Sequence, residues 1–174
     1  NGVDDHVKVL DFGIAKILDE DDSKGTGADP RAEPITAAKS MLTPGGRRMS
    51  VAMTNCGSYG WVSARTGYRY DAIDPESGKP WPPMPESFLR LAREAASAAG
   101  FPGFAPDACL INRYAPGTKL SLHQDRDERD HVAPIVSVSL GLPAVFLFGG
   151  PKRADPTRRV PLAHGDVVVW GGPA

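Results

Sequence analysis

The chain has 174 residues, with 20 lysines and arginines against 21 aspartates and glutamates, for a net charge of −1. This length predicts one domain large enough to bury a hydrophobic core. The near-neutral charge excludes an overall basic field, so any contact with nucleic acid requires a local patch. Two cysteines exclude a disulfide framework, and no apolar run is long enough for a membrane span. We therefore expect a cytoplasmic monomer that does not bind membranes.

Residues 1–40 differ in composition from the rest of the chain. They contain a phrase that resembles the Asp-Phe-Gly strand and turn of bacterial Ser/Thr protein kinases, Val7-Lys8-Val9-Leu10-Asp11-Phe12-Gly13. The Gly-rich and His-Arg-Asp loops of a kinase do not accompany it, so a kinase-derived regulatory fragment is the weakest hypothesis. We expect 1–40 to be a foreign or disordered segment, with 7–10 pairing as a stray edge strand; a linker or docking tail is the alternative.

A strand is predicted over 49–55, followed by an aromatic stretch over 61–70. Trp61, Tyr68 and Tyr70 surround a glycine in this stretch. One interpretation is a hairpin whose rings cover a small core. The other is a lid whose flat rings stack on a flipped-out base.

One helix is predicted over 86–99, and Gly100 lies just past its end. Its apolar residues recur at intervals of three and four: Phe88, Leu89, Ala92, Ala95, Ala96 and Ala99. We expect this helix to be scaffolding without a chemical role.

Further strands are predicted over 108–114, 135–140, 144–148 and 167–170, the last of them buried. In the first of these, Asn112 and Tyr114 leave on the same face. An amide and a phenol there can orient a carboxylate, or they can form a polar cross-strand pair. Four basic residues follow the third strand, either as a solvated hairpin tip or as a phosphate patch: Lys152, Arg153, Arg158 and Arg159.

Polar and apolar residues alternate from Lys119 to His123, which predicts a half-buried strand over 119–125. On a strand, His123 and Asp125 would point to the same side. Together they provide two corners of the 2-His-1-carboxylate triad that holds non-haem Fe(II). The alternative is a surface His/Asp pair without a metal.

Several phrases between residues 41 and 174 resemble, in order, the AlkB family of Fe(II)/2-oxoglutarate-dependent dioxygenases. They include Thr43-Pro44-Gly45-Gly46, Asn112-Arg113-Tyr114, His123-Gln124-Asp125, and His164-Gly165-Asp166 with Trp170-Gly171-Gly172. The resemblance implies an α+β, mainly β fold over 41–174. The expected architecture is an incomplete double-stranded β-helix (jelly roll) with a packing helix and a nucleotide-recognition lid.

The resemblance also implies the roles of individual residues. His123 and Asp125 would bind Fe(II), while Asn112 and Tyr114 would contact 2-oxoglutarate. The base pocket would contain Met53, Trp61, Tyr68 and Asp127. The implied reaction is oxidative dealkylation of N-alkylated bases in DNA or RNA, which consumes O2 and 2-oxoglutarate and releases succinate and formaldehyde.

In the family, a second metal histidine and two arginines that bind 2-oxoglutarate would fall after residue 174. We therefore expect an incomplete copy of such an enzyme with impaired activity. His164 precedes the last strand in a tight turn, so we do not expect it to replace the missing ligand. The alternative is a non-catalytic remnant that binds nucleic acid.

Overall fold

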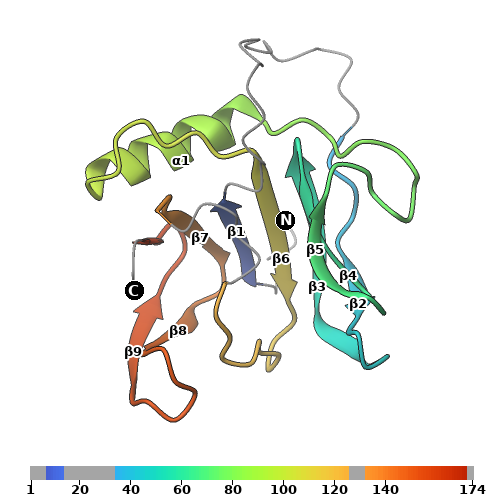
Figure 1. The fold of residues 1–174 in the computed structure, drawn as a ribbon. Helices are drawn as coiled ribbons and strands as arrows, with labels where there is room; N and C mark the ends of the chain where they lie inside the picture. Colours follow the sequence, from blue (N-terminus) through green and yellow to red (C-terminus); the bar gives the residue numbers. More distant parts are fainter. Residues whose placement is uncertain (1–6, 14–33, 126–131, 172–174) are drawn as a thin grey trace, which may run out of the picture.

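The computed structural model describes residues 7–13, 34–125 and 132–171, which contain ten strands and one helix (Figure 1). The mainly β composition with a single helix is the one predicted. The elements are β1 (Val7–Gly13), β2 (Lys39–Leu42), β3 (Arg48–Gly57), β4 (Gly60–Ala64), β5 (Gly67–Asp71), α1 (Glu86–Ala98), β6 (Ala108–Tyr114), β7 (Ile135–Gly141), β8 (Ala144–Gly149), β9 (Thr157–Leu162) and β10 (Val167–Trp170). Within the described part of the chain, no helix has the length and apolar character to cross a membrane.

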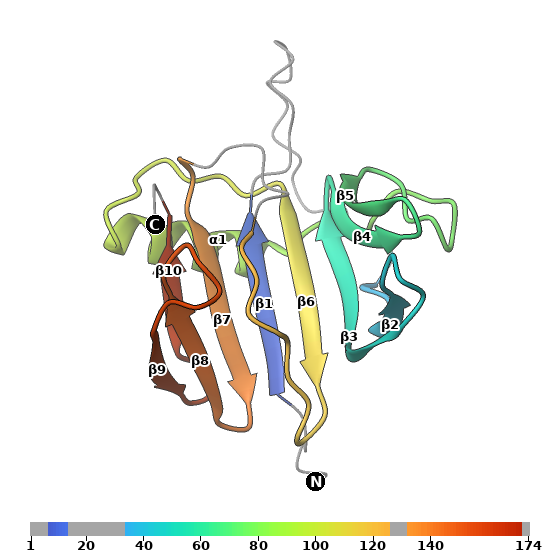
Figure 2. The same cartoon turned by 60° about the horizontal axis from the view of Figure 1, so that its bottom comes forward.

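Six strands form one sheet in the order β10-β7-β1-β6-β3-β2, and every neighbouring pair is antiparallel. Figure 2 shows β1 between β7 and β6, in the middle of this sheet. The prediction of an edge strand over 7–10 is therefore wrong, because this β-prone sequence pairs with a neighbour on both sides. Whether 1–40 is foreign to the domain stays a prediction, although Ile35 packs against the core and Lys39 pairs with Met53.

Helix α1 covers one face of the sheet. Its buried residues Ala92 and Ala96 join a cluster that also contains Cys56, Phe104, Cys109, Val136 and Val138. The helix ends where Gly100 takes a φ of 92°. There the Gly100 N–H donates to the Ser97 carbonyl and the Phe101 N–H to the Ala96 carbonyl, which together satisfy two terminal carbonyls. The predicted stop signal at Gly100 is thus confirmed.

The opposite face of the sheet carries buried polar side chains. Because side chains alternate along a strand, and Ile111 and Val136 pack in the cluster under α1, their neighbours Asn112 and Ser137 face away from the helix. Asn112 and Ser139 are 1% and 2% exposed. Figure 2 shows α1 behind the sheet and the segment that follows β6 in front of it. Polar groups that are buried this well indicate a site on the front face.

Two hairpins flank the sheet. Strands β4 and β5 pair with each other, as do β8 and β9. Strand β10 pairs only with β7, so it is an edge strand and Val167 is 37% exposed. The prediction of a buried strand over 167–170 is therefore wrong, because its run of valines has a neighbour on one side only.

Candidate active site

The segment from Ala115 to Asp125 is irregular and crosses the front face of the sheet (Figure 2). It starts with a turn in which Gly117 has a φ of 80° and the Thr118 N–H donates to the Ala115 carbonyl. The prediction of a half-buried strand over 119–125 is wrong. None of the described strands pairs with this segment, and Leu122 is 38% exposed, so its alternating pattern does not reflect burial.

His123 and Asp125 nevertheless lie side by side. The Nε2 atom of His123 is 3.5 Å from Oδ1 of Asp125. The Nδ1 atom of His123 is 2.8 Å from the carbonyl oxygen of Ser121. A carbonyl oxygen only accepts hydrogen bonds, so Nδ1 carries a proton and Nε2 is the ring nitrogen on the Asp125 side. Metal-binding histidines are oriented in this way by a partner of the second ring nitrogen.

This donor set suits iron but supplies only part of a complete site. An imidazole nitrogen and a carboxylate oxygen are two of the three ligands of a facial triad. Within the described residues, no group of three or more His, Cys, Asp or Glu side chains gathers around a possible metal position. The described residues thus bring together two candidate ligands.

The β8–β9 hairpin holds this segment in place. Gln124 Nε2 donates to the Pro151 carbonyl at 2.9 Å. In the opposite direction, the Arg153 guanidinium donates to the Leu122 carbonyl, also at 2.9 Å. The two hydrogen bonds flank His123, so the hairpin turn supports the position of the candidate ligands. The basic turn that we considered as a phosphate patch has at least one arginine committed to this contact.

Asn112 and Met53 form the floor beside this segment. They are register partners on β6 and β3, so their side chains share a face. Both are buried, at 1% and 4% exposure. Tyr114 leaves β6 on the same face and is half-buried. The structure thus brings together one candidate base-pocket residue and the two candidates for 2-oxoglutarate binding.

The β4–β5 hairpin carries the candidate stacking residues. Trp61 and Tyr68 stack on each other with ring centroids 5.1 Å apart and planes 19° from parallel. Tyr68 is 44% exposed. The aromatic stretch is therefore a hairpin, as both interpretations require, with one ring face directed to solvent.

Asn55 fixes the backbone of this hairpin and was not singled out in the sequence. Its Oδ1 accepts the Trp61 N–H and its Nδ2 donates to the Trp61 carbonyl, both at 3.0 Å. The Asn55 side chain is 1% exposed. The sequence signal that could have identified Asn55 is the alternation of side chains along β3, which places Met53 and Asn55 on the same face.

The remaining candidates lie away from the pair or cannot be placed. The Nδ1 atom of His164 accepts the Gly141 N–H at 2.9 Å, so His164 fastens the turn before β10. This contact agrees with the expectation that His164 is a turn residue. Asp127 and His131 lie outside the described residues.

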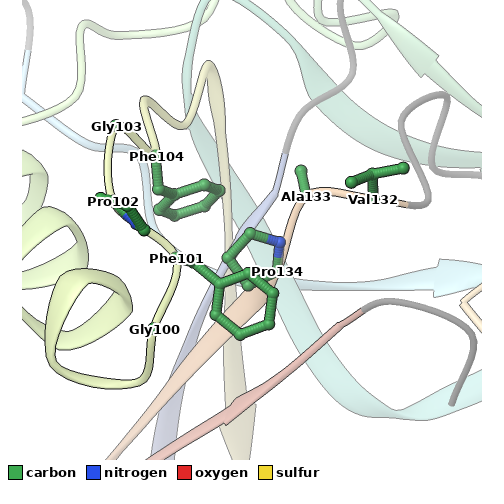
Figure 3. A pocket seen from close by; sticks show the side chains of 8 residues that line it. All are labelled: Gly100, Phe101, Pro102, Gly103, Phe104, Val132, Ala133 and Pro134. Carbon is green, nitrogen blue, oxygen red and sulfur yellow. The ribbon is translucent and has the colours of Figure 1, made fainter.

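A hollow of about 350 Å³ lies between the end of α1 and the start of β7. Figure 3 shows Phe101, Phe104 and Pro134 around it. Among the described residues, its lining contains no titratable side chain and includes neither His123 nor Asp125.

Known proteins resemble this chain in sequence and in fold. A family model of the 2OG-Fe(II) oxygenase superfamily matches residues 22–174. The chain is 69% identical over 134 residues to the alpha-ketoglutarate-dependent dioxygenase AlkB of Escherichia coli (strain K12), covering 77% of this chain and 62% of that protein. It is 35% identical over 112 residues to the nucleic acid dioxygenase ALKBH1 of Mus musculus, covering 64% and 28%.

A solved structure, that of OsALKBH1, superimposes with a TM-score of 0.66 at 32% identity, covering 78% of this chain and 68% of that one. The chain spans 62% of the length of the E. coli relative. The family match and these identities lead to one conclusion: the chain belongs to the AlkB family of 2OG-Fe(II) oxygenases.

Proposed function

We propose that this chain acts in the oxidative dealkylation of N-alkylated bases in DNA or RNA, as part of the repair of alkylation damage. The observation that carries the proposal is the His123–Asp125 pair, with Nε2 and Oδ1 3.5 Å apart and the imidazole oriented by the Ser121 carbonyl. The names of the relatives, a dioxygenase and a nucleic acid dioxygenase, support the reaction and the substrate class. The fold we propose over 41–174 is an incomplete double-stranded β-helix (jelly roll) with a packing helix.

In this proposal His123 Nε2 and Asp125 Oδ1 hold Fe(II). When bound with 2-oxoglutarate, the metal supplies the activation of O2. The Ser121 carbonyl keeps the His123 proton on Nδ1, so that the Nε2 lone pair stays available to coordinate the metal. The Asn112 amide and the Tyr114 phenol hydrogen-bond the co-substrate. Because Asn112 is held on a central strand and is 1% exposed, its amide is fixed in position beside the more exposed His123–Asp125 pair.

The substrate base is proposed to lie under the β4–β5 hairpin, which acts as a nucleotide-recognition lid. The exposed face of the Trp61–Tyr68 stack offers a platform for an unstacked base. Stacking of this kind contributes about 1–3 kcal/mol per base without selecting a sequence. Met53 supplies the apolar floor, and Asp127 favours a cationic methylated base through its charge.

The test measures metal binding and turnover on the same full chain. Fe(II) is titrated without oxygen in the presence of 2-oxoglutarate. Succinate release is then followed in air with a single-stranded oligonucleotide that contains one N-methylated base. We expect His123→Ala and Asp125→Ala each to abolish both signals, whereas His164→Ala, which removes a histidine outside the site, retains them. Unchanged turnover in both ligand variants would contradict the proposal.

A second candidate function is nucleic-acid binding without turnover. It is favoured by the Trp61–Tyr68 stack, which offers a surface for a base and needs no metal. In that case the methylated oligonucleotide binds and Trp61→Ala weakens the binding, but no succinate forms at any Fe(II) concentration. The same titration therefore separates the two candidates.

A further inference from the structure

Strand β1 is the link that holds the six-stranded sheet together. Each of its residues from Val7 to Gly13 lies opposite a residue of β6, and those from Val7 to Phe12 also lie opposite β7. On its other side β6 pairs only with β3, and β7 pairs only with β10. Among the described strands, no other element joins β10 and β7 to the remaining three strands by backbone pairing.

The segment that forms this strand lies outside the region that the family model matches. The family match begins at residue 22, after β1 has ended, whereas β6 and β7 lie well within it. A segment outside the matched region therefore occupies a central position between two matched strands. This arrangement shows that the gap between β6 and β7 accepts a strand on the basis of backbone pairing.

The dimensions of the gap follow from sheet geometry. Neighbouring strands lie about 4.7–4.9 Å apart, so β6 and β7 are separated by about 9–10 Å, which is the width of one inserted strand. Both facing edges carry backbone N–H and C=O groups that need partners, and water would have to solvate them in a narrow slot. An extended segment that pairs antiparallel with both edges satisfies them together.

The sequence of β1 suits this role. Val7, Val9 and Phe12 belong to residue types with a high preference for strands, and the segment contains no proline. Its register places Val9 opposite Asn112 and Val7 opposite Tyr114. The inserted strand therefore runs directly beside the strand that carries the candidate co-substrate residues.

We infer that the gap between β6 and β7 is a strand-acceptor site, and that its occupant, Val7–Gly13, is separable from it. The site binds an extended peptide of this sequence antiparallel to both edges, whether the peptide is part of the chain or is supplied separately. This is β-augmentation, with pairing at two edges in place of one. The inference does not depend on the proposed enzymatic function.

The test displaces β1 from the gap between β6 and β7 in the full chain and then adds the same segment as a separate peptide. Leu10 lies opposite Ile111 and Val138, so Leu10→Pro removes an N–H from the middle of the ladder. We expect this variant to melt at a lower temperature than the wild type. Leu10→Val keeps the N–H and the strand preference and is the matched control, with a melting temperature close to the wild type.

A labelled peptide spanning residues 5–15 should then bind the Leu10→Pro chain and raise its melting temperature. It should bind the wild-type chain at least about tenfold more weakly, because the tethered strand competes at a millimolar effective concentration. A peptide that itself carries Leu10→Pro should not bind. Equal binding to both chains, or equal binding of both peptides, would overturn the inference.

Amide hydrogen exchange on the wild-type chain keeps the inference testable if Leu10→Pro does not fold. We expect the backbone amides from Lys8 to Phe12 to exchange as slowly as those of β6, since both strands are paired on two sides. Exchange of these amides at the rate of an exposed chain would show that the slot is not occupied by this strand.

Discussion

The Nε2 atom of His123 lies 3.5 Å from Oδ1 of Asp125, although the two residues are not on a strand. A short local contact explains this arrangement. The Ser121 carbonyl, two residues before His123, accepts a hydrogen bond from Nδ1. This contact turns the imidazole so that Nε2 points to the carboxylate. The pair is thus oriented by the backbone of its own segment.

The first prediction concerns the tautomer of His123. In the metal-free chain at a pH where the ring is neutral, His123 should carry its proton on Nδ1, because the Ser121 carbonyl cannot donate. Long-range 1H–15N correlation spectra distinguish the two tautomers, and His123→Gln assigns the signal. Addition of Zn(II) should shift Nε2 and leave the Nδ1 proton in place. A proton on Nε2 in the free chain would refute this orientation.

The second prediction concerns Asn55 and the hairpin that it holds. Asn55→Ala removes both hydrogen bonds to the Trp61 backbone, at a cost of about 1–3 kcal/mol for buried groups that lose a partner. We expect a lower melting temperature and weaker binding of a methylated oligonucleotide. Asn55→Asp keeps the acceptor for the Trp61 N–H but places a buried carboxylate against the Trp61 carbonyl, so it should lower the melting temperature at least as much. If oligonucleotide affinity were unchanged in both variants, Asn55 would not position Trp61.

Local signals in the sequence were sufficient for several elements. The helix was predicted to within one residue. Its two signals, the apolar spacing and the glycine at its end, depend only on residues that are close in the sequence. The bounds of β6 were predicted in full, since its strand-forming residues over 108–114 lie between two paired neighbours. The hairpin at Trp61 and Tyr68 followed from aromatic residues around Gly67, which takes a φ of 123°.

Elements that depend on distant partners were not predicted. The central position of β1 is decided by the free edges of β6 and β7, about a hundred residues further along the chain. For the candidate site, the proximity of His123 and Asp125 was predicted, but from a strand that does not form. The contacts of Gln124 and Arg153 with the other segment depend on how the β8–β9 hairpin docks, which no local pattern indicates.

The third prediction is a dependence of stability on pH through Asp71. A backbone hydrogen bond from Ile73, assisted by the Arg69 side chain, holds the pKa of Asp71 below its ordinary value of 3.8. Because the folded pKa is depressed, the stabilisation is fully present above pH 3.8 and is lost as the pH falls through the folded pKa.

Asp71→Asn should therefore lower the melting temperature at neutral pH, by at most the equivalent of about 1 kcal/mol for a partly exposed ion pair. The difference between the two proteins should shrink as the pH is lowered below 3.8. Arg69→Gln should give a smaller effect in the same direction, since the backbone hydrogen bond remains. A difference that grows at acid pH would show that Asp71 is not stabilised in its charged form.

The fourth prediction separates two roles for the basic hairpin turn. The Arg153 guanidinium donates to the Leu122 carbonyl beside His123, and Gln124 returns a hydrogen bond to Pro151. Each contact contributes about 0.5–1.5 kcal/mol to the ordering of the segment, so Arg153→Ala and Gln124→Ala should each weaken Fe(II) binding about 2–12-fold.

Arg158→Ala is the matched control, because it removes the same charge from β9 without removing the Leu122 contact. It should leave Fe(II) affinity unchanged. If the turn is instead only a phosphate patch, Arg153→Ala and Arg158→Ala should weaken oligonucleotide binding alike and reduce its salt dependence, while neither alters metal affinity. Measuring the Fe(II) and oligonucleotide affinities of the same three variants therefore decides whether Arg153 acts on the metal-binding segment. Gln124→Ala changes no charge, so it shows whether a loss of Fe(II) affinity comes from the hydrogen bond.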